Sequence, residues 1–308
     1  MPLRPANVSA VKSRLDALMK TYGPFFLDSD PLGLVHRYPR RDDREVAAFI
    51  AQALAFGNAK AVRTSLGRVY ERLGEQPAET LRSFQIEKNR NLFKGIVHRW
   101  ICADDLSRFA HMTGEALREW GSLETIFMLN YNSSAATLAS ALAAFRGRLL
   151  SLAPGGASKK GFSYLLPDPT RGGASKRMNL FLKWMIRQED GVDLGLWKGP
   201  RSDQLTIPLD THIARIGRLL GLTDRKTPNL KMAEEITDSL RLLCPDDPTR
   251  YDFAISRLGI LGHCPSRPDV SICTECPLQD ICRHWQGESR RKTRQKPKRP
   301  APAGGAIR

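Results

Sequence analysis

The sequence predicts an all-α protein. Three observations support this fold class: segments with the 3.6-residue period of amphipathic helices are frequent, segments that alternate with a period of two are scarce, and the β-branched residues are dispersed. The chain has 308 residues, of which 41% are hydrophobic and 26% are charged. It is therefore long enough for two domains and has a globular composition.

The first half of the chain contains two strong helical segments. The segment that begins at Arg44, REVAAFIAQALAF, is almost entirely apolar and predicts a buried helix. A second helix is expected between Gly57 and Gly74, because Gly74 supplies a stop signal and the apolar residues before it share one helical face. That face consists of Val62, Leu66, Val69, Tyr70 and Leu73.

Four further helices are expected in the second half of the chain. They cover residues 178–188, 211–221, 230–243 and 249–261, and the second of them ends at Gly221. Clusters of Gly, Pro, Ser and Asp predict loops at residues 152–161 and 165–175. Only the second loop runs directly into an apolar helix.

The charge of the chain points to a polyanionic partner. Residues 287–308 carry +7 of the formal net charge of +16, which leaves +9 on the rest of the chain. A basic tail alone is often only a solubilising extension, whereas a basic body as well favours a polyanion, with nucleic acid as the first candidate. An anionic membrane surface fits less well, because the tail lacks apolar anchoring residues.

The start of the chain and its apolar segments indicate a cytoplasmic protein. Residues 1–20 mix charged and apolar residues and contain no continuous apolar core of a signal peptide. No segment approaches the roughly 18 apolar residues that a membrane span needs. We therefore expect a soluble, intracellular monomer without a membrane partner.

Four cysteines in residues 264–282, spaced C-x8-C-x2-C-x5-C, predict a metal site. In a reducing compartment such a group is more often a metal site than a pair of disulfides. Zinc usually takes two C-x2–4-C pairs, but here only Cys273 and Cys276 are that close, while Cys264 and Cys282 lie outside the pair. The spacing leaves both an iron–sulfur cluster and a structural zinc open.

The segment PLDTH at residues 208–212 places an acid at the start of a predicted helix. The simplest function of Asp210 is to cap that helix by accepting hydrogen bonds from its first free N–H groups. Capping does not exclude chemistry, because the helix dipole stabilises a negative charge there and the cap fixes its direction. Such a carboxylate is suited to face a positive charge that develops on a sugar.

Small residues precede the helix in TRGGASKRMNLFLKWMI, residues 170–186. Backbone N–H groups that such residues expose at a helix start can hold a phosphate. Lys176 lies in the first turn. It is either one of 48 basic residues that are simply solvated or a partly desolvated amine that can act as a nucleophile.

Taken in order, these motifs resemble the helix-hairpin-helix DNA glycosylases related to endonuclease III and the adenine-mismatch glycosylases. In that superfamily a glycine-rich hairpin precedes a helix and a V-D-T-H segment starts the next long helix. A C-x6-C-x2-C-x5-C loop that binds a [4Fe–4S] cluster follows roughly fifty residues later. The matching segments here are GGASKRMNLFL, PLDTHIARI and the cysteine loop, within residues 45–283. More narrowly, the chain resembles a bacterial family of that superfamily defined mainly by sequence.

The resemblance implies two helical domains with a cleft between them. Residues 31–205 would form a helical barrel domain with the hairpin near 170–187, and residues 206–286 a helical domain with the [4Fe–4S] cluster. A helix within residues 1–30 would join the second domain, and residues 287–308 would be a disordered basic tail. The cluster ligands would be Cys264, Cys273, Cys276 and Cys282, with zinc as the alternative metal.

The resemblance also implies base excision from double-stranded DNA that contains a lesion or mismatch, with the damaged nucleotide flipped into the cleft. Asp210 would stabilise oxocarbenium character at C1′ or activate the nucleophile. Lys176, in a bifunctional glycosylase and AP lyase, would attack C1′ and form a Schiff base. The expected DNA contacts are Gly172, Gly173 and Ala174 at a backbone phosphate, Phe56 and Asn58 as a wedge, and Arg283 beside the cysteine loop.

Three departures from the superfamily pattern bear on the lyase activity more than on the fold or the cluster. The hairpin reads R-G-G-A-S in place of L-P-G-V-G, Lys176 lies 34 residues before Asp210, and the first cysteine spacing is x8 in place of x6. The alternative function is a non-catalytic nucleic-acid-binding protein on the same scaffold. A third is a zinc-stabilised module whose tail docks an acidic partner.

Overall fold

The computed structural model describes residues 7–155, 160–188, 190–267 and 269–287, and these residues confirm the all-α fold class. Their only pairing of extended segments is an isolated antiparallel bridge between His98 and Ile101. None of the helices in the described part of the chain is long and apolar enough to cross a membrane. The helices are α1 (Val8–Thr21), α2 (Leu32–Val35), α3 (Arg41–Leu54), α4 (Ala59–Leu73), α5 (Pro77–Arg82), α6 (Ile86–Asn89), α7 (Ala103–Trp120), α8 (Leu123–Met128), α9 (Ala139–Ser151), α10 (Lys160–Leu165), α11 (Lys176–Ile186), α12 (Thr211–Leu219), α13 (Leu230–Arg241), α14 (Asp252–Ile260) and α15 (Val270–Cys273), with short 3-10 helices η2 (Pro24–Ser29), η3 (Ser202–Gln204) and η4 (Gln279–Ile281).

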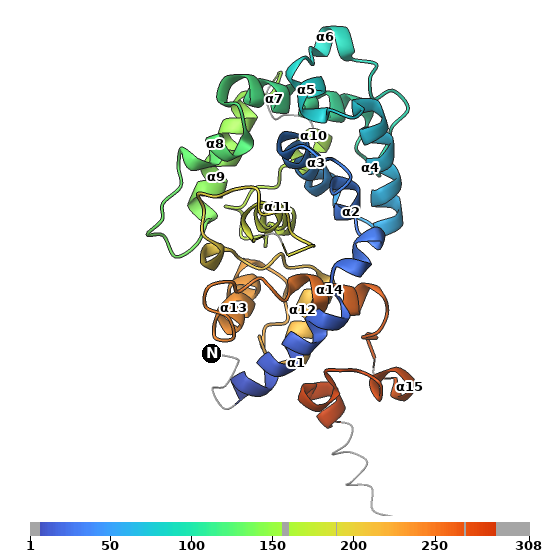
Figure 1. The fold of residues 1–308 in the computed structure, drawn as a ribbon, viewed down its shortest axis with the longest axis vertical. Coiled ribbons are helices and arrows are strands. Elements are labelled where there is room, and N and C mark those ends of the chain that lie inside the picture. The colour runs from blue at the N-terminus through green and yellow to red at the C-terminus, as the bar shows by residue number, and fades with distance from the viewer. Residues whose placement is uncertain (1–6, 156–159, 189, 268, 288–308) are drawn as a thin grey trace, which may run out of the picture.

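The buried apolar residues form two clusters, which we call the first and the second core. The first core draws on residues 32–205, and in Figure 1 its helices surround α11. The second core draws on residues 207–278 together with residues 11–22. Helix α1 therefore packs with the end of the chain, against α14, and not with the helices that follow it in sequence.

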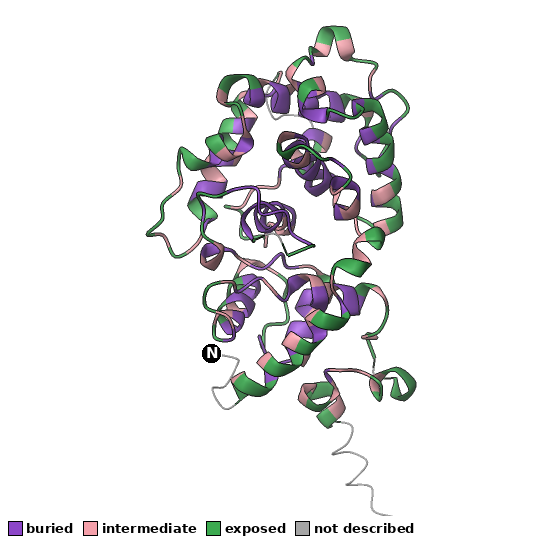
Figure 2. Ribbon diagram, in the orientation of Figure 1, coloured by how far each residue is buried: buried purple, intermediate pink, exposed green. Residues whose placement is uncertain are grey.

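Helices α3 and α11 pack together at the centre of the first core. Every residue of α3 from Glu45 to Leu54 is buried, as its apolar sequence requires. Figure 2 shows both helices almost wholly buried. The rings of Phe49 in α3 and Phe181 in α11 lie 5.2 Å apart. The packing of α11 against α3 thus fixes the direction in which the first turn of α11 points.

The start of α11 and the start of α12 both lie at the boundary between the cores. The backbone N–H of Leu230, at the start of α13, donates to the carbonyl of Gly172 just before α11 at 3.1 Å. Helix α12 packs against α14, where Gly259 touches the ring of His212 so closely that an added Cβ would lie 2.5 Å from Nδ1. Only glycine permits this approach of the two helices.

Buried ion pairs also join the two cores. Arg257 of α14 contacts the carboxylate of Asp30 at 2.6 Å, and both side chains are largely buried. Arg187, which follows α11, contacts Asp247 of the second core at 2.9 Å. Because a buried charge that loses its partner is costly, these pairs resist separation of the cores.

Candidate active-site cleft

A cleft of about 900 Å³ lies between the two cores. Its walls come from the segment after α3, the first turns of α11, the start of α12, and α14. Four of the predicted site residues line it, namely Asp210, Lys176, Phe56 and Asn58. Three segments that are far apart in sequence therefore meet at one cavity.

Asp210 caps α12 and keeps one carboxylate oxygen for the cleft. Its Oδ1 accepts the backbone N–H of Ile213 at 2.7 Å, which confirms the predicted N-cap. Its Oδ2 has no hydrogen-bond partner within the described residues. Since the side chain is half-buried in the wall of the cleft, the second oxygen is available to a ligand there.

Lys176 and His212 line the cleft together with Asp210. Burial lowers the pKa of His212, the charge of Asp210 raises it, and the charges of Arg215 and Lys176 lower it, so that the pKa is lowered overall. The ring is therefore mostly neutral at pH 7. Lys176 forms no ion pair in the part of the chain that the structure describes, so its ammonium group is not held by a carboxylate.

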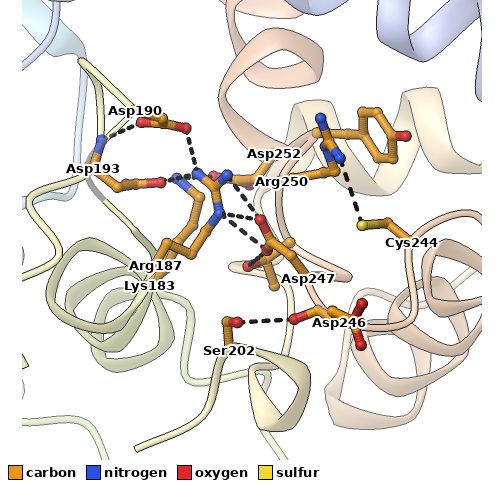
Figure 3. A network of polar contacts seen from close by, with 12 residues as sticks. Lys183, Arg187, Asp190, Asp193, Ser202, Cys244, Asp246, Asp247, Arg250 and Asp252 are labelled. Atoms are coloured by element: carbon orange, nitrogen blue, oxygen red, sulfur yellow. Dashed lines mark hydrogen bonds and ion pairs between the residues drawn. The ribbon is translucent and has the colours of Figure 1, made fainter. Parts of the chain in front are cut away.

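Lys183, two turns further along α11, lies in a buried ion network (Figure 3). Its Nζ is 3.0 Å from Asp193 Oδ1 and 3.4 Å from Asp252 Oδ2, and its side chain is 1% exposed. Burial lowers the pKa of Lys183, but the two carboxylates raise it by more, so this lysine stays protonated. Arg187 contacts Asp193 and Asp247 in the same network.

Asp252, in the first turn of α14, is the least compensated carboxylate of that network. Its only ionic partner among the described residues is Lys183, and it is 4% exposed. Burial is the largest cause that raises its pKa, the charges of Asp210 and Asp193 raise it further, and Lys183 lowers it, with a result of about 6. Asp210 and Asp252 thus influence each other, and both line the cleft.

Arg177 is a buried cation that carbonyl groups and rings hold in place. Its guanidinium donates to the carbonyl of Ala53 at 2.6 Å and to that of Tyr164, and it lies over the rings of Phe56 and Tyr164. Burial lowers the pKa of Arg177 to about 10, so it remains charged at pH 7. It joins the end of α3 to the start of α11. Phe56 is consequently held in the wall of the cleft.

A tight turn beside this wall presents two exposed side chains. The N–H and carbonyl groups of His98 and Ile101 exchange hydrogen bonds of 3.0 and 2.9 Å, which leaves Arg99 and Trp100 at the tip. Arg99 has a φ of 56°, a left-handed conformation that costs roughly 1 kcal/mol or more for a residue other than glycine. Trp100 is 50% exposed and its ring lies 4.9 Å from that of Tyr164. An exposed indole on a strained turn at a cleft is suited to stack on a base.

The loop before α11 leaves the first N–H groups of that helix without a side-chain cap. Ser175 has a φ of 43° and makes no cap hydrogen bond, and its Oγ is buried without a partner in the described chain. Gly172 and Gly173 are exposed and Ala174 is half-buried. These three residues do not line the cleft, but Ser175 does. The arrangement is suited to hold an anion such as phosphate.

Two of the predicted DNA contacts have protein partners. The Oδ1 atom of Asn58 accepts the N–H of Ala61 at 2.8 Å and caps α4. Arg283 lies outside the cleft, where its Nη1 donates to Asp224 at 2.6 Å and its guanidinium covers Gly221. Both side chains are nevertheless at the surface.

The four cysteines of the predicted metal site also lie outside the cleft, at the end of the second core. All four are free thiols and half-buried. Turns between Cys273 and Cys276 and before Cys282 wind the chain around them. Burial raises the pKa of Cys264 and of Cys276, and the charges of the other cysteines raise both further. The four thiols therefore share one loop at the end of the second core.

Cysteine sulfur atoms such as those of this loop are ligands that both iron–sulfur clusters and zinc accept. No group of three or more His, Cys, Asp or Glu among the described residues is arranged to hold a metal ion. Arg215 donates to the sulfur of Cys264 at 3.1 Å and to the carbonyl of Pro265 at 2.8 Å. Such a donor stabilises a thiolate ligand.

A family model described as "Protein of unknown function (DUF2400)" matches residues 30–261. The match covers most of the chain. The chain belongs to this family. Every residue that lines the cleft lies within the matched region, while the four cysteines follow its end. A search of the curated proteins finds no match.

Several residues in or beside the cleft were not found from the sequence. Lys183 had one signal, because it interrupts the apolar segment MNLFLKWMI and a lysine inside a buried helix needs a carboxylate partner. No local pattern singled out Asp252, whose partner is about seventy residues earlier in the chain. Trp100 lies in a segment without helical periodicity, and its exposure depends on the turn at its neighbour Arg99.

Proposed function

We propose that this protein is a DNA glycosylase that releases a damaged or mismatched base in the cleft. The observation that carries the proposal is the meeting of Asp210 and Lys176 at one cavity between two helical cores. Asp210 has a free carboxylate oxygen, and Lys176 has no ion pair within the described chain. A fixed carboxylate and an unpaired amine are the two groups that N-glycosidic cleavage with lyase activity requires.

Each of the two residues has a distinct role in this proposal. Asp210 faces the sugar of the flipped nucleotide, where its charge opposes the positive charge that develops at C1′. Lys176 attacks C1′ with its amine and forms a Schiff base, which permits strand cleavage by β-elimination. If Lys176 stays protonated, water takes its place and only the base is released.

The surroundings of the cleft support DNA as the substrate. Trp100 offers a stacking surface next to the opening, and the start of α11 offers free N–H groups to a backbone phosphate. The positive charge of the chain favours the same partner. A non-catalytic DNA-binding protein would use these features as well, so catalysis itself has to be measured.

The test is a panel of duplex oligonucleotides with different lesions and mismatches, assayed for base release and strand nicking. Asp210→Asn should still cap α12, because Asn is as good a cap as Asp. We expect it to bind the duplex like the wild type but to release base about a thousandfold more slowly. Asp203→Asn, which changes an acid outside the cleft, should have no effect. Binding without release by the wild type would establish the non-catalytic alternative.

The lyase step has a separate test. Borohydride should trap a covalent adduct between the wild type and abasic DNA, since it reduces a Schiff base. Lys176→Met should form no adduct, while Lys198→Met, which removes a lysine outside the cleft, should form it normally. An adduct that persists in Lys176→Met would assign the nucleophile to another amine.

We further propose that Cys264, Cys273, Cys276 and Cys282 hold a [4Fe–4S] cluster, which would pin the loop after α14 in shape. Purified protein should then be yellow-brown and contain about four iron and four sulfide per chain. Cys273→Ser should lose the colour, whereas Cys244→Ser, which changes a cysteine outside the loop, should keep it. Colourless protein that contains zinc would contradict the cluster.

A further inference from the structure

The cleft is lined by two carboxylic acids whose surroundings differ. Both lie at the start of a helix, Asp210 as the half-buried N-cap of α12 and Asp252 in the first turn of α14, so a helix dipole acts on both. Asp252 is 4% exposed, and among the described residues its carboxyl group contacts only one cation, Lys183, at 3.4 Å. Burial disfavours the charged form of such a group. The deeper burial of Asp252 thus favours its protonated form.

The charges around Asp252 do not balance. Two cations in the buried network face four carboxylates, so the network accommodates a proton most easily on the carboxylate with the weakest partners. Asp193 contacts both cations, and Asp190 accepts two backbone N–H groups as well as one ion pair. Asp247 is 25% exposed and is therefore partly solvated. Asp252 has none of these advantages and is the site for the proton.

Three groups face Asp252 from the elements packed against it. Lys183 comes from α11, Asp193 from the loop that follows α11, and Asp210 from the start of α12. The attraction of one cation is opposed by two negative charges and by burial, which holds the pKa of Asp252 at about 6. A general acid works best when its pKa is near the working pH.

We propose that Asp252 is a second catalytic residue of the cleft, the acid that gives a proton to the departing base while Asp210 faces the sugar. The proposal rests on the glycosylase function proposed above. It also defines the substrate class, because a proton turns a neutral base into a better leaving group. A base that already carries a positive charge leaves without one. Two carboxyl groups in different protonation states are the usual solution for cleaving a glycosidic bond.

The step balances in atoms and charge. The electron pair of the bond between C1′ and the base nitrogen moves onto the base, and the proton of the Asp252 carboxyl moves to a nitrogen or oxygen of that base. The base leaves neutral, the sugar carries the positive charge, and Asp252 becomes a carboxylate. Water or the amine of Lys176 then adds to C1′ and releases a proton, which restores the carboxyl group of Asp252.

The test is the pH dependence of single-turnover base release, measured with a neutral lesion that the wild type releases. The protonated fraction of Asp252 falls as the pH rises, so the wild-type rate should decline above about pH 6 and approach a tenfold loss per pH unit. Asp252→Asn keeps the shape of the side chain but has no proton to give. We expect its rate at pH 6 to be about a hundredfold lower and to lose this decline.

Two further variants separate catalysis from structure. Asp252→Glu restores a titrating carboxyl group and should restore a decline, at a shifted pH. Asp247→Asn changes a carboxylate of the same network that does not line the cleft, and the pH profile should keep its shape. Thermal unfolding and duplex affinity, measured for each variant, report on the fold independently of the chemistry.

Each outcome is decisive. A decline above pH 6 that persists in Asp252→Asn assigns the proton to another group and overturns the proposal. If Asp252→Asn does not fold, a wild-type rate that does not decline above pH 6 overturns it equally. The proposed function fails in a different way, namely when the folded, DNA-binding wild type releases no base from any duplex of the panel, and the role of Asp252 falls with it.

Discussion

Lys176 and Lys183 lie two turns apart on α11 and line the same cleft, yet their surroundings are opposite. Lys183 is buried between Asp193 and Asp252, and its pKa is raised. Lys176 is half-buried and has no ion pair within the described residues. One helix thus supplies the cleft with a buried lysine held by two carboxylates and with a half-buried lysine that has no ion pair within the described residues.

The difference teaches that burial of a charged residue beside a cavity does not by itself mark reactivity. Lys183 is the more deeply buried lysine, but its two carboxylates hold the proton on its nitrogen, which therefore has no lone pair to attack with. Its function is to join the cores and to set the charge of Asp252. The candidate nucleophile is the less conspicuous lysine, Lys176.

The largest effect on stability is expected from Lys183→Met. The substitution keeps much of the volume but leaves Asp252 without a cation and Asp193 with one fewer. We expect the free energy of unfolding at pH 8 to fall by about 3–5 kcal/mol, measured by urea denaturation. A loss below about 1 kcal/mol would mean that the network relaxes around the missing charge, and the contrast between the two lysines would be weak.

The second prediction concerns the pH dependence of stability at the floor of the cleft. The pKa of Asp252 is raised to about 6, above its unfolded value, so the folded protein binds more protons than the unfolded chain between those values. Its contribution to stability is therefore present at low pH and is lost as the pH rises through about 6.

Asp252→Asn has no such titration. Comparison of the two proteins cancels the contributions of all other groups. From pH 7 down to pH 4, the wild type should gain on the order of 2 kcal/mol of unfolding free energy relative to Asp252→Asn. Urea denaturation across this range measures the gain. A constant difference would show that Asp252 is ionised throughout.

The third prediction concerns the mouth of the cleft. Trp100→Ala should weaken binding to duplex DNA with an unpaired base by about 1–2 kcal/mol, because one stacking surface is lost. The control is Phe25→Ala, since Phe25 is 90% exposed and its ring lies against Phe26, whereas the ring of Trp100 lies against Tyr164 in the wall of the cleft. Fluorescence anisotropy measures both affinities. Equal losses for the two variants would remove Trp100 from the DNA-binding surface.

The smallest effect is expected from Lys176→Met, the counterpart of the first variant. Because Lys176 has no ion pair among the described residues, its loss should change the free energy of unfolding by less than about 0.5 kcal/mol. The measurement is the same urea denaturation. A loss of unfolding free energy comparable with that of Lys183→Met would show that Lys176 has a structural role. The two lysines of α11 would then not differ in the way described.

Most of the fold follows from local patterns in the sequence. The five residues predicted on one face of α4 are all buried, and Gly74 ends that helix with a φ of 76°. Asp210 caps α12, and Gly221 follows the end of that helix in a left-handed conformation. Periodicity, caps and stop signals act within a few residues, so they can be recognised without knowledge of the packing.

The ionic floor of the cleft could not be predicted in this way. The contact between Lys183 and Asp252 joins segments far apart in the chain, and it exists only because α11 and α14 meet at the boundary of the cores. The exposure of Trp100 depends in the same way on how the strained turn at Arg99 packs beside Tyr164. Local sequence patterns contain no information on contacts between segments that are far apart in the chain. The cysteine spacing showed which residues share a loop but not how their sulfur atoms are arranged.

Gly259 sets the distance between α12 and α14 without contributing a side chain to the cleft. An alanine methyl group at this position would lie 2.5 Å from the ring of His212, so α12 and α14 could accommodate it only by moving apart. That movement would carry Asp210 away from Asp252, although neither acid had been altered. Gly259 therefore controls the separation of the two carboxyl groups through the spacing of their helices. A search for functional positions among polar side chains alone would overlook it.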